Sequence, residues 1–237
     1  MRIRIDLTRA FVTSYIVFMI LTFPLVVAAE AQQPPKVRAP ESGRPSDAIV
    51  LFDGSDLSAW MFPDGRPAGW IVSEGAMTVK DGGIVTRQHF GDIQLHLEFA
   101  TPSPSEGTGQ DCGNSGVYFQ GNYELQVLDS YENETYIDGM CGAIYEIAPP
   151  LVNATRPPGV WQVYEVMFRA PRFDAEGNVV RKGVITAYLN GVLIQDHVEV
   201  HPTRANITEG KERPLGSLYL QDHGHPVRYR NIWVREL

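Results

Sequence analysis

Cysteine and basic residues are both scarce in this sequence, and each scarcity excludes a class of protein. Only two cysteines, Cys112 and Cys141, are present, which is too few for a disulfide-rich scaffold, and neither has a second cysteine at zinc-ligand spacing. Lys and Arg number 20 against 28 Asp and Glu, so the net charge of −8 makes nucleic acid and anionic membranes poor partners. Beyond the N-terminal region, no apolar run is long enough to span a membrane as a helix.

The first 31 residues have the pattern of a secretory signal peptide. An arginine-rich start precedes the apolar run FVTSYIVFMILTFPLVVAA, and small residues follow at the place of a cleavage site. Because the apolar run is long, an uncleaved N-terminal membrane anchor is the alternative. Residues 32–47 are rich in proline and polar residues, as in a disordered linker, which leaves 48–237 for one folded domain. The sequence therefore predicts a secreted protein without membrane contact beyond this N-terminal segment.

Short alternating or β-branched runs fill the chain from residue 49 onward, and nothing longer than a turn has helical period. This pattern predicts an all-β sandwich or jelly roll of antiparallel strands. The turns Lys80-Asp81-Gly82-Gly83 and Leu189-Asn190-Gly191-Val192 predict hairpins, the second with a type I′ turn. The predicted strands are 49–52, 70–74, 77–80, 92–100, 115–120, 123–129, 142–147, 160–170, 183–190, 192–200, 217–223 and 227–237.

Polar side chains occupy one face of two predicted strands. Glu124 and Gln126 alternate with apolar residues in one strand and are followed by Asp129, while His96 and Glu98 alternate with apolar residues in the other. Polar, planar side chains on the outer face of a sheet suit hydroxyl bonding and ring stacking to a sugar. The sequence thus predicts a sugar cleft, with a plain solvated face, or a structural His96–Glu98 ion pair, as alternatives.

Four segments together resemble a known family. They are LFDGSDLSAW (51–60), CGNSGVYFQGNYELQVLDSY (112–131), CGAIYEIAPPLVNATRPPGVWQVYEV (141–166) and LYLQDHGHPVRYRNIWVREL (218–237), and they span nearly all of the predicted domain. The family is that of the 3-keto-disaccharide hydrolases. The resemblance implies a concanavalin A-like lectin/glucanase jelly roll of two antiparallel sheets, and location in the bacterial periplasm or outside the cell. It also implies a 3-keto-glycoside substrate, which a sugar 3-oxidoreductase partner in the same pathway would supply.

A ketone at C3 of a sugar acidifies the hydrogen on C2, so the C1 aglycone can leave by elimination, followed by addition of water. This route needs a base near C2, a donor or cation near the ketone oxygen, and an acid for the leaving oxygen. Glu124, His223 and His96 are candidate bases, because partial burial can tune a carboxylate or imidazole toward neutrality. No metal-ligand motif is visible and no cofactor is required, although a divalent metal would also hold the enolate charge.

The predicted catalytic residues are Glu124, His223 and Asp222, the last two from a polar segment at a strand end, where a surface turn is the alternative. A Cys112–Cys141 disulfide would pin two of the resembling segments beside the Glu124 strand, and two buried free thiols are the alternative. The predicted substrate-binding residues are His96, Glu98, Asn114, Tyr118, Gln126, Asp129, Glu146, Gln221, Arg228 and Arg230.

Several of these residues have structural alternatives, and the chain has functional ones. Arg228 and Arg230 share one side of the last strand and either hold a developing oxyanion or form a cross-strand salt bridge, and Asp129 is otherwise a turn cap. A retaining glycosidase is the second enzyme class, because Glu124-Leu-Gln126-Val-Leu-Asp129 imperfectly matches the Glu-x-Asp-x-(x)-Glu motif of glucanases. A lectin-like module without catalysis is the third.

Overall fold

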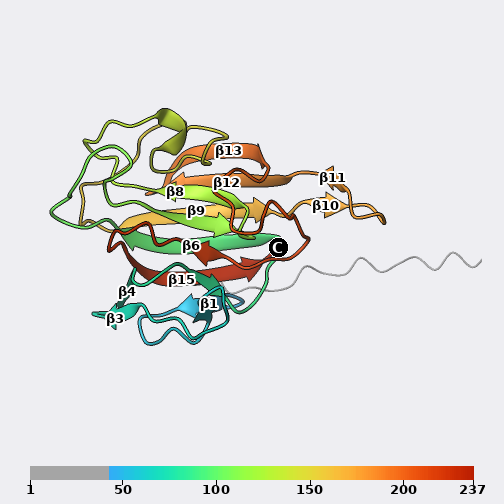
Figure 1. Cartoon of the computed structure of the whole chain (residues 1–237), viewed down its shortest axis with the longest axis horizontal. Helices are drawn as coiled ribbons and strands as arrows, with labels where there is room; N and C mark the ends of the chain where they lie inside the picture. Colours follow the sequence, from blue (N-terminus) through green and yellow to red (C-terminus); the bar gives the residue numbers. More distant parts are fainter. Residues whose placement is uncertain (1–42) are drawn as a thin grey trace, which may run out of the picture. The chain divides into compact units, whose positions relative to one another are not determined.

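The apolar residues that alternate along the longest strands build two facing antiparallel sheets. The computed structural model describes residues 43–237, so the predicted signal peptide and most of the predicted linker lie outside the described residues. The larger sheet has eight strands in the order β13-β12-β9-β6-β15-β4-β3, with β1 also paired to β15 (Figure 1). Its strands are β1 (Ile49–Phe52), β3 (Ile71–Ser73), β4 (Ala76–Thr78), β6 (Ile93–Ala100), β9 (Gln162–Arg169), β12 (Gly183–Leu189), β13 (Val192–Val200) and β15 (Arg228–Glu236).

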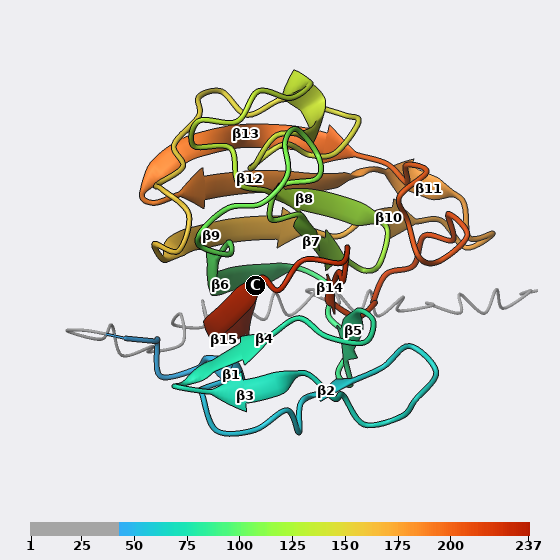
Figure 2. The same ribbon diagram turned by 60° about the vertical axis from the view of Figure 1, so that its left-hand side comes forward.

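The smaller sheet has five strands in the order β2-β5-β14-β7-β8. Within the described part of the chain, the remaining elements are a two-stranded hairpin, which projects beyond the sandwich in Figure 2, and one short 3-10 turn, η1. The bounds are β2 (Trp60–Met61), β5 (Ile84–Thr86), β7 (Ser115–Phe119), β8 (Tyr123–Val127) and β14 (Tyr219–Leu220) for the sheet, β10 (Arg172–Phe173) and β11 (Val179–Arg181) for the hairpin, and Ile137–Gly139 for η1.

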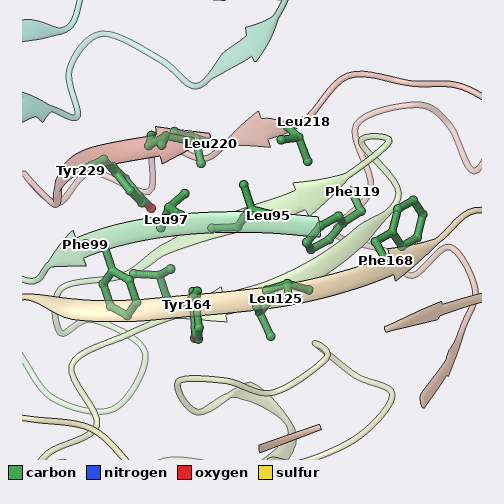
Figure 3. Packing of buried hydrophobic residues seen from close by; sticks show 14 of the residues in the cluster. Leu95, Leu97, Phe99, Phe119, Leu125, Tyr164, Phe168, Leu218, Leu220 and Tyr229 are labelled. Carbon is green, nitrogen blue, oxygen red and sulfur yellow. The ribbon is translucent and has the colours of Figure 1, made fainter. Parts of the chain in front are cut away.

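The core lies between the inner faces of the two sheets (Figure 3). Apolar side chains of β6 and β9 face those of β7, β8 and β14, and aromatic rings pack across the gap, with the Phe119 and Phe168 centroids 5.0 Å apart. Each fully buried side chain of this kind contributes about 1.5 to 3 kcal/mol. Because strand side chains alternate, the core requires Tyr118, Glu124 and Gln126 to lie on the outer face of the small sheet.

The predicted all-β jelly-roll sandwich is confirmed, and most predicted strands form. The Asn190-Gly191 turn joins β12 to β13 with φ of +54° and +81°, and the Asn190 side chain accepts a hydrogen bond from Val163 N at 2.9 Å. The hairpin predicted at Asp81-Gly82 is wrong, because this turn carries the chain from β4 in the large sheet to β5 in the small sheet. Strands β2, β5, β10 and β11 are absent from the predicted strands, because two or three residues are too few to give a reliable periodic signal.

The predicted Cys112–Cys141 disulfide is absent, and both cysteines are buried free thiols. Cys141 belongs to the core, where its sulfur lies 3.3 Å from the Tyr164 hydroxyl oxygen. Cys112 instead lines a cavity outside the core, with its sulfur 3.8 Å from Asp129 Oδ2. Asp129 N donates to the Cys112 carbonyl and Cys141 N donates to Ser130 Oγ, so both segments contact the residues after β8, but each thiol has its own nearest partner and no bond joins them.

Thiol titration checks this correction. Protein unfolded in guanidinium without reductant should react with two equivalents of Ellman's reagent, one for each cysteine. The native protein should react slowly, because burial raises the pKa of Cys112 and raises that of Cys141 to about 11. Reductant should leave the melting temperature unchanged, whereas a fall on reduction, together with no free thiol before it, would restore the disulfide.

Candidate active site

The outer face of the small sheet carries the polar residues that form the base of the candidate site. Strand pairing places Tyr118 opposite Glu124 and Gly116 opposite Gln126, while Leu125 faces the core. Although this face points away from the core, Glu124 is 4% exposed and Gln126 is 1% exposed. Loops therefore cover this part of the sheet, and the two side chains form the floor of a pocket, as predicted, and not a solvated face.

The Glu124 pocket has a volume of about 350 Å³, at the lower end of the range for small-molecule sites. It is lined by strand β8, by the residues after β14, and by loops from three other parts of the chain. The lining residues are Gln110, Asn114, Glu124, Gln126, Tyr136, Tyr145, Arg204, Ala205, Gln221 and His223.

Burial raises the pKa of the Glu124 carboxyl to about 8, and the negative charge of Glu146 adds to this effect. A hydrogen bond from the Tyr118 hydroxyl opposes it, and that hydroxyl in turn accepts one from Gln221 Nε2 at 2.9 Å. Glu124 is therefore mostly protonated at neutral pH but can lose its proton close to it. A carboxyl group in this range suits general acid and base catalysis.

Glycine at position 116 leaves room for the Glu124 carboxyl. A Cβ at Gly116 would lie 2.4 Å from Glu124 Oε1 and 2.7 Å from Tyr118 Cε2, closer than real contacts allow. The Glu124 side chain therefore lies across the backbone of β7 at this point. Any larger residue at Gly116 has to displace it.

Amide side chains complete the floor and leave two hydrogen-bond acceptors unused. Gln126 Nε2 lies 3.3 Å from both Asn114 Oδ1 and Gln110 Oε1, and Asn114 Nδ2 donates to the Gln110 carbonyl at 2.8 Å. The side-chain oxygens of Gln126 and Gln221 are buried and have no hydrogen-bond partner. Because such an acceptor costs free energy when unpaired, the pocket suits a ligand that brings hydroxyl donors, as a sugar does.

The side of the pocket beyond β8 is aromatic and cationic. Tyr145 N donates to the Glu124 carbonyl at 3.0 Å, which places Tyr145 directly beside Glu124. The Tyr145 hydroxyl lies 2.9 Å from that of Tyr136 and accepts a hydrogen bond from Arg204. Arg204 Nε pairs with Glu146 Oε1 at 2.5 Å. Glu146, predicted to bind substrate, does not line the pocket and contacts it through Arg204.

His223 lines the pocket at the other side, after β14, whereas Asp222 does not line it. The Asp222 carboxylate accepts hydrogen bonds from Gly82 N at 2.7 Å and Gly224 N at 2.8 Å. It therefore joins two loops and is not free to act on a ligand in this pocket. Of the three predicted catalytic residues, the structure brings Glu124 and His223 together.

His96 and Glu98 lie on the outer face of the large sheet, because their apolar neighbours in β6 face the core. His96 bonds through Nδ1 to Glu165 and through Nε2 to Asn231 Nδ2 at 3.0 Å. Glu98 Oε2 pairs with Arg230 Nε at 2.7 Å. Both residues therefore belong to a polar network across the sandwich from the Glu124 pocket.

Arg228 and Arg230 belong to that same outer face. Their guanidinium carbons lie 5.4 Å and 4.0 Å from the centre of the Trp161 ring, and Arg228 also pairs with Glu74 at 3.4 Å. Neither lines the Glu124 pocket. The structure supports the salt-bridge alternative for both residues and not a contact with the substrate there.

Asp129 lines a different cavity, together with Cys112 and Ser105. Its carboxylate accepts hydrogen bonds from Ser105 Oγ and from Tyr131 N, the latter at 3.2 Å, as a turn cap does. Glu124 and Asp129 thus open into separate cavities. They do not form the facing carboxylate pair that a retaining glycosidase needs.

Five lining residues are absent from the predicted site, namely Gln110, Tyr136, Tyr145, Arg204 and Ala205. They come from irregular loops, one of which, 142–147, is wrongly predicted as a strand, and a loop residue that folds back over a sheet has no periodic signal. Within 43–237, no three His, Cys, Asp or Glu side chains are grouped to hold a metal ion. In the same residues, no helix is long and apolar enough to cross a membrane.

The fold and the pocket together define a jelly-roll sandwich with a sugar-sized polar site over one sheet. A family model described as "3-keto-alpha-glucoside-1,2-lyase-like domain" matches residues 47–235, and the chain belongs to this family. The family predicted from the four sequence segments is thereby confirmed. Family membership implies a carbohydrate substrate and a glycoside-cleaving enzyme that acts on 3-keto sugars.

The chain is also similar to solved structures and to a named bacterial protein. A crystal structure from Parabacteroides distasonis ATCC 8503, provisionally assigned as a glycosyl hydrolase, is 41% identical, covers 89% of this chain and 95% of its own, and superposes with a TM-score of 0.82. A second structure from that organism, 20% identical over 81% of this chain and 94% of its own, has a TM-score of 0.59 and shares the fold. A 3-keto-disaccharide hydrolase of Bacteroides thetaiotaomicron is 24% identical over 80% of this chain and 78% of its own.

Substitution of Gly116 tests the geometry of the floor. Gly116→Ala should lower turnover at least about 100-fold, because the new methyl group takes the place of the Glu124 carboxyl. Gly183→Ala is the control, since it adds a methyl to a strand of the large sheet, 3.1 Å from Val200 Cγ2 and away from the pocket. Equal activity in the two variants would contradict the packing of Glu124 across β7.

The pH dependence of stability tests the burial of Glu124. Its folded-state pKa of about 8 exceeds the ordinary value of 4.5, so the folded state holds a proton that the unfolded state releases. The free energy of unfolding should therefore fall as pH rises between these two values. Relative to wild type, Glu124→Gln should gain stability by a few kcal/mol over this window, as measured by urea unfolding.

Glu98→Gln is the matched control. Although burial opposes it, hydrogen bonds from Asn231 and Arg230 lower the pKa of Glu98, so this carboxyl is ionised in both states above about pH 5. Its effect on stability should stay constant from about pH 5 to 8. If the difference in unfolding free energy between Glu124→Gln and wild type also stayed constant with pH, the Glu124 carboxyl would be solvated and would not be buried.

Proposed function

We propose that this protein cleaves 3-keto-glycosides by eliminating the group on C1 and then adding water. The observation that carries the proposal is the buried carboxyl of Glu124, which has a pKa of about 8. It lines a pocket together with Gln126 and Gln221, whose side-chain oxygens have no partner and can accept hydrogen bonds from sugar hydroxyls. Family membership supports the substrate class.

Glu124, in its carboxylate form, removes the proton from C2 of the 3-keto sugar. The electron pair of the C2–H bond forms a C2=C3 bond, and the ketone oxygen takes the negative charge of an enolate. The ketone then reforms as a C1=C2 bond is made and the C1–O bond breaks, so that the electron pair leaves with the aglycone oxygen, which takes up a proton from solvent. Water finally adds its hydroxyl to C1 and releases its remaining proton to solvent, replacing the one that the aglycone took up, and Glu124 returns its proton to C2.

The positions of the lining residues support these roles. Glu124 lies between Tyr145, beside it on one side, and Gln221 and His223 at the end of β14 on the other. C2 likewise lies between C1 and C3 in the sugar. A sugar whose C2 meets Glu124 can therefore direct its ketone toward His223, which donates a hydrogen bond to the developing enolate oxygen.

The unpaired side-chain oxygens of Gln126 and Gln221 accept hydrogen bonds from the remaining sugar hydroxyls in this arrangement. Tyr118 positions Glu124, because it joins the carboxyl to Gln221 without lining the pocket itself. These contacts orient the substrate so that its C2 hydrogen faces the base, which is a large part of the rate enhancement available without a cofactor.

We further propose that the chain is exported, on the strength of its N-terminal sequence pattern. The substrate carries a ketone where ordinary glycosides carry a hydroxyl, so an oxidation at C3 has to precede this reaction. A sugar 3-oxidoreductase is therefore the expected supplier. Cell fractionation with and without the first 31 residues tests the location.

The first experiment compares a 3-keto-glucoside with its unoxidised parent in a time course, with and without EDTA. The keto form alone should be cleaved, because only the ketone acidifies C2, and loss of activity with EDTA would add a divalent metal to the mechanism. Glu124→Gln should lower turnover at least about 100-fold while binding persists. Binding of either sugar without cleavage would instead establish a lectin-like module, and cleavage of both would indicate ordinary glycoside hydrolysis.

The pH profile gives an independent check on the base. Because Glu124 acts as a carboxylate and its pKa is about 8, kcat/KM should rise about tenfold per pH unit toward pH 8 and level off above it. Gly183→Ala should keep this profile. A plateau that begins near pH 5 would assign the base to a carboxyl with an ordinary pKa.

A further inference from the structure

The aromatic side of the Glu124 pocket has no role in the steps assigned so far. Tyr136 and Tyr145 form this side with Arg204, and their rings meet edge to face with centroids 6.3 Å apart. Tyr136 precedes η1, and Arg204 follows β13, so segments distant in sequence meet here. None of these residues belongs to the hydrophobic core.

Tyr136, Tyr145 and Arg204 form what we call the wall of the pocket, and hydrogen bonds hold this wall in place although it is partly exposed. Tyr136 is 45% exposed, and the Arg204 side chain is 76% exposed. Hydrogen bonds join the hydroxyls of Tyr136 and Tyr145, and Glu146 N donates to the Asp138 carbonyl at 3.1 Å, which ties the two tyrosine segments together. An ordered, exposed ring at the rim of a pocket offers a flat apolar face to a ligand.

The chemistry of the pocket decides which part of the substrate meets this wall. Glu124 has to reach C2, and the unpaired acceptors of Gln126 and Gln221 attract the hydroxyl-bearing edge of the sugar. With the ketone toward His223, C1 and its substituent lie on the opposite side, toward Tyr145. Because Tyr136 and the Arg204 side chain are exposed at the rim of this pocket, a substituent directed toward Tyr145 extends over them.

We propose that Tyr136, Tyr145 and Arg204 form a subsite for the leaving group, which selects substrates whose leaving group is a hydroxyl-bearing ring. The ring packs on the exposed face of Tyr136, and the Arg204 guanidinium bonds a ring hydroxyl. A phenolic ring and a second sugar share this chemistry, whereas a methyl group does not. This inference rests on the proposed function and names the substrate class of the same site.

The test compares 3-keto-glucosides that carry methyl, hydroxyphenyl or glucosyl groups on C1. Tyr136→Ala should lower kcat/KM about fivefold for the hydroxyphenyl and glucosyl substrates and leave the methyl substrate within about twofold of wild type. Each substrate is its own reference, so differences in leaving-group reactivity cancel. Whether both ring substrates lose activity, or only one, tells which kind of ring the subsite takes.

Two further variants serve as controls. Tyr136→Phe keeps the ring and should stay near wild type, and Tyr131→Ala removes a tyrosine of similar exposure, 44%, that lies outside the pocket. Equal losses for all three substrates, or no loss for any, would overturn the subsite. If wild type cleaves none of them, the proposed function fails instead.

In that case calorimetry with unoxidised hydroxyphenyl glucoside still tests the subsite. Weaker binding to Tyr136→Ala than to wild type, with Tyr131→Ala unchanged, would support a ring-binding wall on a non-catalytic site. Equal affinity for the three proteins would overturn it.

Discussion

The burial of one carboxyl group sets the properties of this site. Glu124 lies on the face of a strand that a sandwich normally leaves in water, and covering loops remove it from solvent. Desolvation then raises its pKa to about 8 against the hydrogen bond from Tyr118. A protonated acid that can become a base near neutral pH is a costly group to bury, and proteins keep such groups chiefly where chemistry requires them.

The rest of the structure supports that carboxyl in separate ways. The core fixes the alternation of β7 and β8, so apolar packing between the sheets decides that Glu124 and Gln126 share the outer face. The absence of a side chain at Gly116 lets the carboxyl lie flat across the neighbouring strand. Amide groups around it use donors on one another, and the side-chain oxygens of Gln126 and Gln221 are left without a partner. The site is therefore rigid on its floor, while its rim is open.

Period and turn chemistry were sufficient to predict the sandwich and the floor of the site. Glu124 and Gln126 follow from strand alternation, which is a local property of the chain, and Gln221 follows from its polar segment at a strand end. Strand alternation could not predict the wall of the pocket, because Tyr136 and Arg204 come from separate loops that meet only when the chain has folded. The alternation of polar and apolar residues also shows only which side of a strand faces outward, and it does not show to which of the two sheets the strand belongs.

That second limit explains the misplaced residues. His96 and Arg230 have the same outward pattern as Glu124, but their strands belong to the large sheet, so they gather around Trp161 and Trp233 on the far face of the sandwich. The thiols show the same limit at shorter range. The segments of Cys112 and Cys141 run near each other, but one thiol lies beside Asp129 and the other beside Tyr164. The spacing of the cysteines in the sequence does not predict these environments.

The wall beside Glu124 also protects an edge. Strand β8 is the last in the small sheet, and the segment that carries Tyr145 bonds along it through Gly142 N, Gln126 N and Tyr145 N. An uncovered edge strand is a template on which other chains can pair and aggregate. Substitutions can therefore change the side chains of the proposed leaving-group subsite. The backbone of the Tyr145 segment has to keep its place along β8, because it covers an edge at which chains would otherwise aggregate.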